Sequence, residues 1–200
     1  MNKNLDERTG IAVDIDGTLL DFVNPFLAYY NQRFGTIFRE EDVFSFDFWK
    51  VFGLKEGDEI PAILDFYDSK YFKNLQPIPG SQEAISELSK RFQLAVVTAR
   101  PKEISKETIY NLERFFPNSF SEFHFANHKF PENGNQSKSS FCVSNEYKFM
   151  IEDSADYARE CAKSGISVLL LEQPWNWETL HPRVFRVRNW NEINKYFQGK

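Results

Sequence analysis

The sequence predicts an α/β fold, a Rossmann-like parallel sheet with helices on both faces and a small helical domain inserted after the first strand. From residue 81 onward, short apolar runs alternate with stretches of helical periodicity, as strands and helices do in such folds. The apolar runs are continuous, which is typical of parallel strands buried on both faces. Residues 23–78 break this alternation with largely helical sequence. A loop between a strand and the next helix normally takes ~2–6 residues, so this segment must be an insertion.

Length and charge limit the classes of protein that the chain can represent. Its 200 residues suit one domain with a sizeable insertion or two small domains. With 42% hydrophobic and 26% charged residues, the composition is that of a folded, soluble protein. The net charge of -5 argues against binding to a nucleic-acid polymer, which normally requires a basic surface. A small phosphorylated ligand remains compatible with this charge, because a metal ion and a few local cations can offset it.

The cysteines and the apolar runs bear on the location of the protein. Cys142 and Cys161 are the only cysteines, and neither belongs to a metal-type pair. The first ten residues are polar and mixed in charge, so no secretory signal is visible. No apolar run approaches the ~20 residues that cross a bilayer. We therefore expect a cytoplasmic protein without a membrane partner, acting as a monomer or a homodimer.

The first predicted strand ends in two acidic residues. An apolar run at residues 11–13 precedes Asp14 and Asp16, and Gly17 then turns the chain. Acids at alternate positions of a strand share one face, but their directions diverge where the backbone turns, so they are free to take different roles. Asp14 lies nearest the carboxyl end of the strand, where open α/β sheets place their ligands. An Asp-Gly pair alone would indicate only a turn, and residues elsewhere decide against that interpretation.

The inserted segment is expected to consist of helices around an aromatic-rich stretch. Asn24 and Pro25 predict a helix start, with Asn24 as the N-cap, and Gly35 predicts a stop. Residues 43–52 are rich in Phe, and residues 57–72 have helical spacing. Because the segment leaves directly after the acidic pair, it should lie over the carboxyl edge of the sheet. We therefore expect a core domain of residues 1–22 and 79–200, capped by a helical domain of residues 23–78.

The remaining elements follow in alternation after the insertion. Helices are predicted at residues 81–91, 105–115 and 154–164, and strands at residues 94–97, 123–126, 149–151 and 168–171. Residues 184–187 are expected to form an edge strand before a last short helix. A right-handed parallel sheet built in this order brings the carboxyl ends of its strands to one edge.

Polar side chains follow several of these strands, at positions where a buried sheet does not otherwise require them. Besides the acidic pair, they are Thr98 and Arg100 after the second strand, Lys138 in a polar loop, and Glu152 and Asp153 after the fourth. Carboxylates from two strands suit a hard divalent cation, and Mg²⁺ typically takes one or two of them together with substrate phosphate. A hydroxyl and an ammonium group can hold the remaining phosphate oxygens. The sequence therefore predicts a site for Mg²⁺ and a small phosphorylated substrate.

This order of motifs resembles that of the haloacid dehalogenase superfamily. The matching residues are the run DIDGT at 14–18, Thr98, Lys138 and the pair Glu152-Asp153, and the resemblance covers roughly residues 10–177. It implies that Asp14 is a nucleophile that forms an aspartyl-phosphate, and that Asp16 is the general acid and base. It also implies Mg²⁺ held by Asp14, the backbone carbonyl of Asp16, and Asp153, with phosphate bound by Thr98, Lys138 and Arg100. An acid at position 16 argues against dehalogenase chemistry and against the ion-pump branch, which has Lys there.

Several assignments stay open at this stage. Lys129 and Lys148 compete with Lys138, although Lys129 comes early and Lys148 opens the fourth strand at the opposite end of the sheet. Thr98 could instead cap the helix that follows it. Glu152 either orders a metal-bound water or is only a neighbour of the site.

A closer resemblance is to the 5'(3')-deoxyribonucleotidase branch of this superfamily. It rests on Asp21-Phe22, on the aromatic segment, and on residues 77–80, 98–101 and 174–176, the last of which read Pro-Trp-Asn. It implies removal of phosphate from nucleoside monophosphates, often deoxypyrimidine ones, with the base against aromatic side chains of the insertion. The candidates for this wall are Phe44, Phe46, Phe48 and Trp49, since stacking on a base is worth ~1–3 kcal/mol. The alternative is that these aromatics form the small core of the insertion.

Three functions are compatible with this sequence. The first is a Mg²⁺-dependent phosphatase for nucleoside monophosphates, and the second is the same chemistry on another small ester such as a sugar phosphate. The third is a binding or regulatory protein that keeps the fold without turnover. The third function is disfavoured because the sequence retains every residue of the motifs that the chemistry needs. These residues are Asp14, Asp16, Thr98, Lys138 and Asp153.

Overall fold

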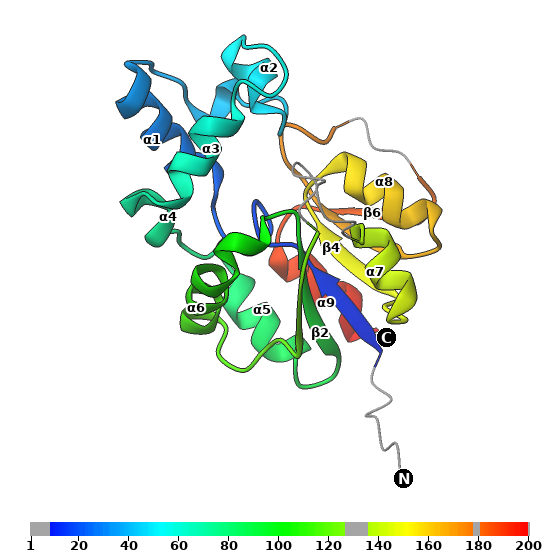
Figure 1. Ribbon diagram of the computed structural model, residues 1–200. Helices are drawn as coiled ribbons and strands as arrows, with labels where there is room; N and C mark the ends of the chain where they lie inside the picture. Colours follow the sequence, from blue (N-terminus) through cyan, green and yellow to red (C-terminus); the bar gives the residue numbers. More distant parts are fainter. Residues whose placement is uncertain (1–8, 127–135, 178–180, 200) are drawn as a thin grey trace.

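A six-stranded parallel sheet forms the centre of the molecule, in the order β3-β2-β1-β4-β5-β6 (Figure 1). The computed structural model describes residues 9–126, 136–177 and 181–199. Its strands are β1 (Gly10–Val13), β2 (Gln93–Thr98), β3 (Glu122–Phe125), β4 (Phe149–Glu152), β5 (Ser167–Leu171) and β6 (Val184–Val187). Every neighbouring pair is parallel. The predicted fold class is therefore confirmed, and the expected edge strand is β6.

Both faces of the sheet are covered by helices, as continuously apolar strands require. One face carries α5 (Ser81–Leu88), α6 (Ser105–Phe115) and α9 (Trp190–Gln198), and the other carries α7 (Lys138–Ser144) and α8 (Ala155–Lys163). Side chains of β1 alternate between the two hydrophobic clusters. Ile11 and Val13 pack with α5 and α9, and Ala12 packs with α7 and α8. Full burial of an Ile or Val side chain contributes about 1.5–3 kcal/mol, so both clusters hold β1 in the sheet.

β1 lies at the point where the strand order reverses. From β1 the chain moves outward through β2 to β3 on one side, and then crosses back to β4 on the other side. In open α/β sheets, ligands bind outside the carboxyl ends of the strands at such a switch point. The register pairs Val13 of β1 with Ile151 of β4. Asp14 and Glu152, the next residue of each strand, therefore leave the sheet side by side.

The segment between β1 and α5 folds into short helices above the carboxyl edge of the sheet (Figure 1). They are α1 (Val23–Phe34), α2 (Phe48–Phe52), α3 (Ile60–Tyr67) and α4 (Lys70–Lys73), with a 3-10 turn at Glu40–Asp42. Phe26 packs among them, with the ring centroid of Phe48 at 4.7 Å and that of Phe66 at 5.2 Å. One hydrophobic cluster continues from these rings into the sheet. The division into two domains at residues 22 and 79 therefore stays a prediction.

Two predictions for this segment are wrong. The helix expected at residues 57–72 is two helices, because Ser69 has an extended backbone and its Oγ accepts the N–H of Phe72 as an N-cap. Asn24 is not the N-cap of α1, since that helix already begins at Val23. The Asp21 carboxylate instead accepts the backbone N–H of Asn24 at 3.3 Å. In both places a short polar side chain offers the backbone a partner that helical periodicity does not reveal.

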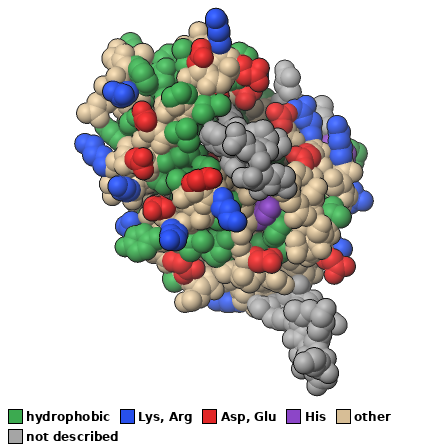
Figure 2. Space-filling model, viewed as in Figure 1, with side chains coloured by type: hydrophobic (Ala, Val, Ile, Leu, Met, Phe, Trp, Pro, Cys, Tyr) green, Lys and Arg blue, Asp and Glu red, His purple; other side chains and the backbone are tan. Residues whose placement is uncertain are grey.

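The face drawn in Figure 2 carries acidic and basic side chains interspersed, and its visible part has no continuous basic area. Hydrophobic side chains are numerous over the half of the molecule that holds the insertion. Exposed large side chains of that segment include Phe34, Ile37, Phe44 and Leu64. Among the described residues, no helix has the length and apolar character needed to span a membrane.

Candidate active site

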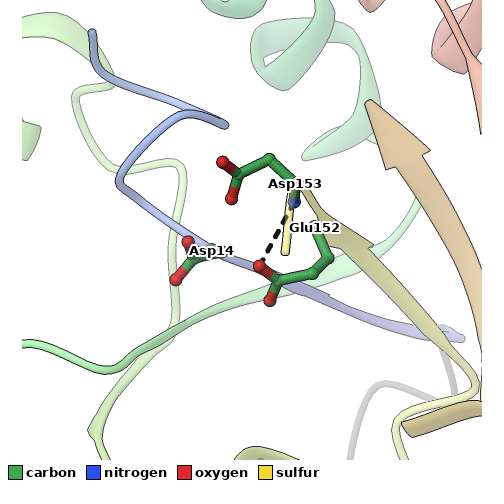
Figure 3. A group of neighbouring side chains, drawn as sticks. All are labelled: Asp14, Glu152 and Asp153. Carbon is green, nitrogen blue, oxygen red and sulfur yellow. Dashed lines mark hydrogen bonds between the residues drawn. The ribbon is translucent and has the colours of Figure 1, made fainter. Parts of the chain in front are cut away.

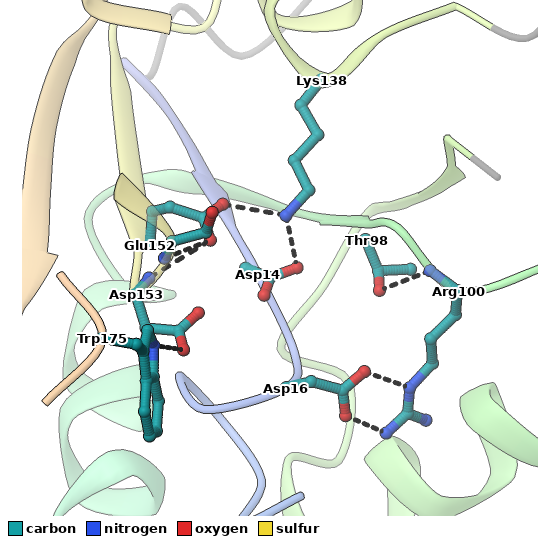
Figure 4. A network of polar contacts seen from close by, with 9 residues as sticks. Asp14, Asp16, Thr98, Arg100, Lys138, Glu152, Asp153 and Trp175 are labelled. Carbon is teal, nitrogen blue, oxygen red and sulfur yellow. Dashed lines mark hydrogen bonds and ion pairs between the residues drawn. The ribbon is translucent and has the colours of Figure 1, made fainter. Parts of the chain in front are cut away.

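Asp14 lies at the carboxyl end of β1, and Lys138 reaches it from the start of α7. The N–H of Asp14 still bonds to the carbonyl of Ile151 at 3.0 Å, so strand pairing fixes its position. Ser137 caps α7 through its Oγ, which accepts a backbone N–H one turn further on, and the helix therefore begins at Lys138. The Lys138 ammonium donates to Asp14 Oδ1 at 2.7 Å and to Glu152 Oε2 at 2.8 Å (Figure 4).

Of the two candidate lysines that the structure describes, Lys138 is the one that lies at this point, where it is 1% exposed. The backbone N–H of Lys148 bonds to the carbonyl of Gly10, at the opposite end of β1. Lys129 lies outside the described residues. The choice of Lys138 by its distance ahead of the fourth strand therefore agrees with its place in the fold.

Glu152 shapes the turn that follows β4. Its Oε1 accepts the backbone N–H groups of Asp153 at 3.2 Å and Ser154 at 3.0 Å, while its Oε2 faces Lys138. Both oxygens of this fully buried carboxylate are thus bonded. Gly17 lies directly against the turn, with φ of +77°, and a Cβ there would lie 2.1 Å from Asp153 Oδ2. Only glycine permits this approach of the two strand ends.

Asp14, Glu152 and Asp153 form a group of buried carboxylates at the ends of β1 and β4 (Figure 3). Each offers one oxygen within 4.8 Å of the others. Carboxylate oxygens are the ligands that Mg²⁺ prefers, so this donor set fits a single Mg²⁺. The Asp16 side chain is not a member of the group; its predicted part in metal binding involves the backbone carbonyl.

The buried carboxylates of this group outnumber the ammonium groups beside them. Burial raises the pKa of Asp14 to about 7, Lys138 opposes the shift, and Glu152 adds to it. Burial also raises the pKa of Asp153 well above its ordinary value, with Glu152 and Asp14 adding to the shift. Burial alone would lower the pKa of Lys138, but Asp14 and Glu152 more than reverse this and hold it well above 10.5. One ammonium therefore faces three carboxylates, an imbalance that a divalent cation would correct.

Asp16 points away from this group and is held by Arg100 (Figure 4). The guanidinium Nε and Nη2 donate to the two carboxylate oxygens at 2.8 and 2.6 Å. Nη1 bonds to the Thr108 hydroxyl at 3.2 Å, and the ring centroid of Phe72 lies 4.7 Å from the guanidinium carbon. Thr98 Oγ1 accepts the backbone N–H of Arg100 at 3.2 Å. The hydroxyl of Thr98 thus shapes the turn after β2. It does not cap the helix that follows, because the N-cap position of α6 is Ile104.

Phosphate binding by Thr98 and Arg100 stays a prediction. A hydroxyl that accepts one hydrogen bond can still donate its own proton, so the bond to the Arg100 backbone does not conflict with that role for Thr98. The Arg100 side chain is 1% exposed, and its Nε, Nη1 and Nη2 all have protein partners. In this position the guanidinium binds Asp16, through Nε and Nη2.

A cavity of about 300 Å³ opens between these residues and the insertion. All the polar residues predicted for the site line one end: Asp14, Asp16, Thr98, Arg100, Lys138, Glu152 and Asp153. The other walls are mainly apolar, with Phe22, Phe46, Phe48, Ile60, Ile63, Tyr67 and Trp175 among them. An apolar pocket of this size with a few convergent polar groups is typical of a small-molecule site.

Two of the four aromatic candidates line this cavity, Phe46 and Phe48. Phe48 is 1% exposed and also packs inside the insertion, so both interpretations of the aromatic segment apply to it. Phe44 is 62% exposed, and the ring of Trp49 lies against the Lys50 ammonium. Neither belongs to the cavity walls.

Tyr67 and Trp175 also line the cavity, although no sequence pattern singles them out as site residues. Tyr67 has the spacing of a core residue in a helix, and its position in the last turn of α3 is what exposes it to the cavity. Trp175 belongs to the Pro-Trp-Asn stretch, which the sequence linked to the nucleotidase branch without a role. Its Nε1–H donates to Asp153 Oδ2 at 3.1 Å (Figure 4).

Comparison with known proteins agrees with this geometry. The model of the family described as "5' nucleotidase, deoxy (Pyrimidine), cytosolic type C protein" matches residues 8–198. The chain belongs to this family. A nucleotidase from Clostridium acetobutylicum is 26% identical to this nucleotidase-family protein over 193 residues, 94% of this chain and 92% of that one. A 5'(3')-deoxyribonucleotidase from Bacillus subtilis is 31% identical over 109 residues, 54% of this chain and 60% of that protein.

Solved structures share the fold of this nucleotidase-family protein. A haloacid dehalogenase-like family hydrolase from Streptococcus pneumoniae has a TM-score of 0.68 at 18% identity, covering 96% of this chain and 99% of that one. The Bacillus subtilis protein YfnB, solved bound to magnesium, has a TM-score of 0.66 at 15% identity, covering 96% and 99%. The resemblance to the haloacid dehalogenase superfamily and its deoxyribonucleotidase branch is thus confirmed, and so is the enzyme class, a phosphoric monoester hydrolase.

Proposed function

We propose that this protein is a Mg²⁺-dependent phosphohydrolase that releases phosphate from (deoxy)nucleoside monophosphates through an aspartyl-phosphate on Asp14. The position of Lys138 carries the proposal. Its ammonium bonds to both Asp14 and Glu152 at the polar end of an aromatic-walled cavity. A nucleophile, a counter-charge for phosphate and a carboxylate group that fits Mg²⁺ thus meet at one point.

In the first step, a carboxylate oxygen of Asp14 forms a bond to phosphorus while the bond from phosphorus to the ester oxygen breaks. The ester oxygen keeps the electron pair and takes a proton from Asp16, so the nucleoside leaves as an alcohol. Lys138 and Thr98 offset the charge on the phosphoryl oxygens. Because both oxygens of Asp16 accept from Arg100, proton donation requires Asp16 to turn partly away from the guanidinium.

In the second step, water attacks the phosphorus of the aspartyl-phosphate and gives a proton to Asp16. The bond between phosphorus and Asp14 breaks, which returns the carboxylate and releases inorganic phosphate. Mg²⁺, held by Asp14, Asp153 and the carbonyl of Asp16 with Glu152 beside it, would supply positive charge to the phosphate oxygens. Lys138 keeps its proton throughout, since its two carboxylate partners hold its pKa well above 10.5 after opposing the effect of burial.

The cavity walls favour a nucleoside over a sugar as the group that leaves. Phe46, Phe48, Tyr67 and Trp175 form an aromatic surface next to the polar end, and stacking of a base on such a ring is worth ~1–3 kcal/mol. A sugar phosphate would leave this surface without a partner. The name of the Bacillus subtilis relative, a 5'(3')-deoxyribonucleotidase, supports a deoxynucleotide. The description of the matched family supports a cytosolic location.

A substrate panel tests the proposal. Phosphate release would be measured with Mg²⁺ on dUMP, dTMP, other nucleoside monophosphates and several sugar phosphates. We expect the highest kcat/KM on a nucleotide, loss of activity with EDTA, and recovery when Mg²⁺ is added back. A clear preference for sugar phosphates would contradict the nucleotide assignment, and activity that survives EDTA would contradict the metal dependence.

A further inference from the structure

The loop after β5 has no role in the chemistry proposed above, but its residues support Asp153. Asn176 is 1% exposed, and its Nδ2 donates to the carbonyls of Asp153 at 2.8 Å and Leu171 at 2.7 Å. Arg186 on β6 donates to the Asn176 side chain at 3.1 Å. The turn after β4 is thus tied to the ends of two further strands. Residues 174–176 are therefore a fixed support for Asp153.

Trp175, in the same loop, contacts the side chain of Asp153. Its Nε1–H donates to Oδ2 at 3.1 Å, and Figure 4 shows the indole beside the carboxylate. An indole has only this one hydrogen to donate, so the bond defines the direction in which the carboxylate turns. Because the orientation of the carboxylate is fixed in this way, so is the direction in which Asp153 offers an oxygen to a cation together with Asp14 and Glu152.

The ring of Trp175 also meets the insertion. The Phe46 ring lies edge-to-face against it, with centroids 5.2 Å apart and an interplanar angle of 70°. Phe46 in turn packs against Phe48, with centroids 5.6 Å apart, and against Phe22 at 6.3 Å. Both Trp175 and Phe46 line the cavity. One side chain therefore joins a candidate metal ligand to the aromatic cluster of the insertion.

We propose that Trp175 is a positioning residue that couples the seating of Phe46 over the cavity to the orientation of Asp153 toward Mg²⁺. The proposal rests on the proposed function in so far as Asp153 holds Mg²⁺. An aromatic substrate group lying against Phe46 and Trp175 acts on the same contact. Binding of the substrate and of Mg²⁺ then strengthen each other, because each favours the same position of the indole.

Trp175→Phe separates the two contacts, because it keeps a ring for Phe46 and removes the N–H that orients Asp153. We expect the Kd for Mg²⁺, measured by calorimetry without substrate, to rise about 10-fold, as for other hydrogen bonds behind a metal ligand. The loss in kcat should be restored by excess Mg²⁺. The matched control is Trp177→Phe, since the Trp177 indole is 69% exposed and lies against Arg186. An unchanged Kd in Trp175→Phe overturns the proposal.

A double-mutant cycle with Phe46→Leu tests the coupling itself. We expect Phe46→Leu to raise the Kd for Mg²⁺ about 3-fold in the natural protein, and to change it little when Trp175 is already Phe. Equal effects in both backgrounds would show that Phe46 does not act through Trp175. If Trp175→Phe fails to fold, a natural Kd in Phe46→Leu alone overturns the proposal. Failure of the natural protein to hydrolyse nucleotides would reject the proposed function and leave these Mg²⁺ measurements valid.

Discussion

Arg100 binds both carboxylate oxygens of Asp16, at 2.8 Å from Nε and 2.6 Å from Nη2. The same guanidinium lies 4.7 Å from the ring centroid of Phe72 in α4, so the candidate proton donor is linked to the insertion as well as to the sheet. A planar guanidinium can hold a carboxylate with two parallel bonds, whereas an ammonium cannot. Arg100 therefore fixes the direction of Asp16 before substrate enters.

Replacing this fork tests the role of Arg100. We expect Arg100→Lys to lower kcat ~10–100-fold, a part of the ~10²–10⁴-fold that a positioned acid contributes, with a smaller change in KM. Thr108→Val removes only the bond to Nη1 and should change kcat much less. Steady-state kinetics on the preferred substrate gives both constants. A rise in KM larger than the fall in kcat would instead assign Arg100 to phosphate binding.

Loss of the nucleophile should separate chemistry from metal binding. Asp14→Asn cannot form an aspartyl-phosphate, so we expect kcat to fall by ~10³-fold or more. Mg²⁺ should still bind, more weakly, because Glu152 and Asp153 remain. Phosphate release and calorimetry check the two statements. Asp21→Asn alters an acid at the start of α1 and serves as the control. Substantial turnover in Asp14→Asn would remove Asp14 as the nucleophile.

The raised pKa of Asp14 predicts how stability depends on pH without metal. Burial raises this pKa from 3.8 to about 7, so the folded state binds a proton more tightly than the unfolded state does. The stability from this proton is fully present below pH 3.8 and is lost as pH rises through about 7. Asp14→Asn mimics the protonated form. In EDTA, the variant should therefore gain stability over the natural protein as pH rises. We expect this gain in the free energy of unfolding to be larger at pH 8 than at pH 5 by on the order of 1–3 kcal/mol. Urea unfolding at the two pH values measures this difference, and a difference independent of pH would contradict it.

Gly17 should tolerate no side chain. Its φ is +77°, and a Cβ would lie 2.1 Å from Asp153 Oδ2, so we expect Gly17→Ala to lower the free energy of unfolding by about 2–4 kcal/mol and to weaken Mg²⁺ binding. Gly35→Ala is the matched control, because its φ is +69° and no atom lies within 4 Å of the added carbon. Backbone strain alone should cost that variant about 1 kcal/mol. Equal losses in the two variants would show that the close approach to Asp153 is unimportant.

Removal of the buried ammonium should destabilise the site. Lys138→Met leaves Asp14 and Glu152 without their shared partner, and we expect a loss of about 3–5 kcal/mol in the free energy of unfolding. Mg²⁺ should recover part of this loss, since it also neutralises the carboxylates. Lys148→Met, at an exposed position, should stay within about 0.5 kcal/mol of the natural protein. A small loss at position 138, similar to that control, would contradict the buried ion pairs.

Apart from Lys138, the polar site residues that could be predicted from the sequence lie at the end of a buried strand or shortly after it. Asp14 follows the apolar run at residues 11–13, and Glu152 and Asp153 follow the run at residues 149–151. Parallel strands bring such ends to one edge. The register of the sheet then determines which of these side chains are neighbours, because Val13 pairs with Ile151 and the next residue of each strand has little freedom of position. The strands and the insertion could be read from periodicity for the same reason, since burial on both faces requires continuous apolar runs.

The break between α3 and α4 could not be read in this way. The spacing of apolar residues continues across Ser69, and the break depends on the hydroxyl bonding to the N–H of Phe72. Such a bond competes locally with the helix and leaves the hydrophobic pattern unchanged. The same holds for Asp21, which replaces Asn24 as the partner of the first turn of α1.

The sequence by itself determined the sheet and the acidic motif, because these depend on short-range patterns and on the topology that they impose. The class of reaction followed from the resemblance of the motifs to those of a known superfamily. The tertiary structure decided how the acids are used. It joins Asp16 to Arg100, 84 residues away, and Asp153 to Trp175, 22 residues away, through contacts that carry no periodic signal. It also decided that Phe46 rather than Phe44 faces the cavity, because the direction of a side chain in an irregular segment is set by the packing of the whole insertion.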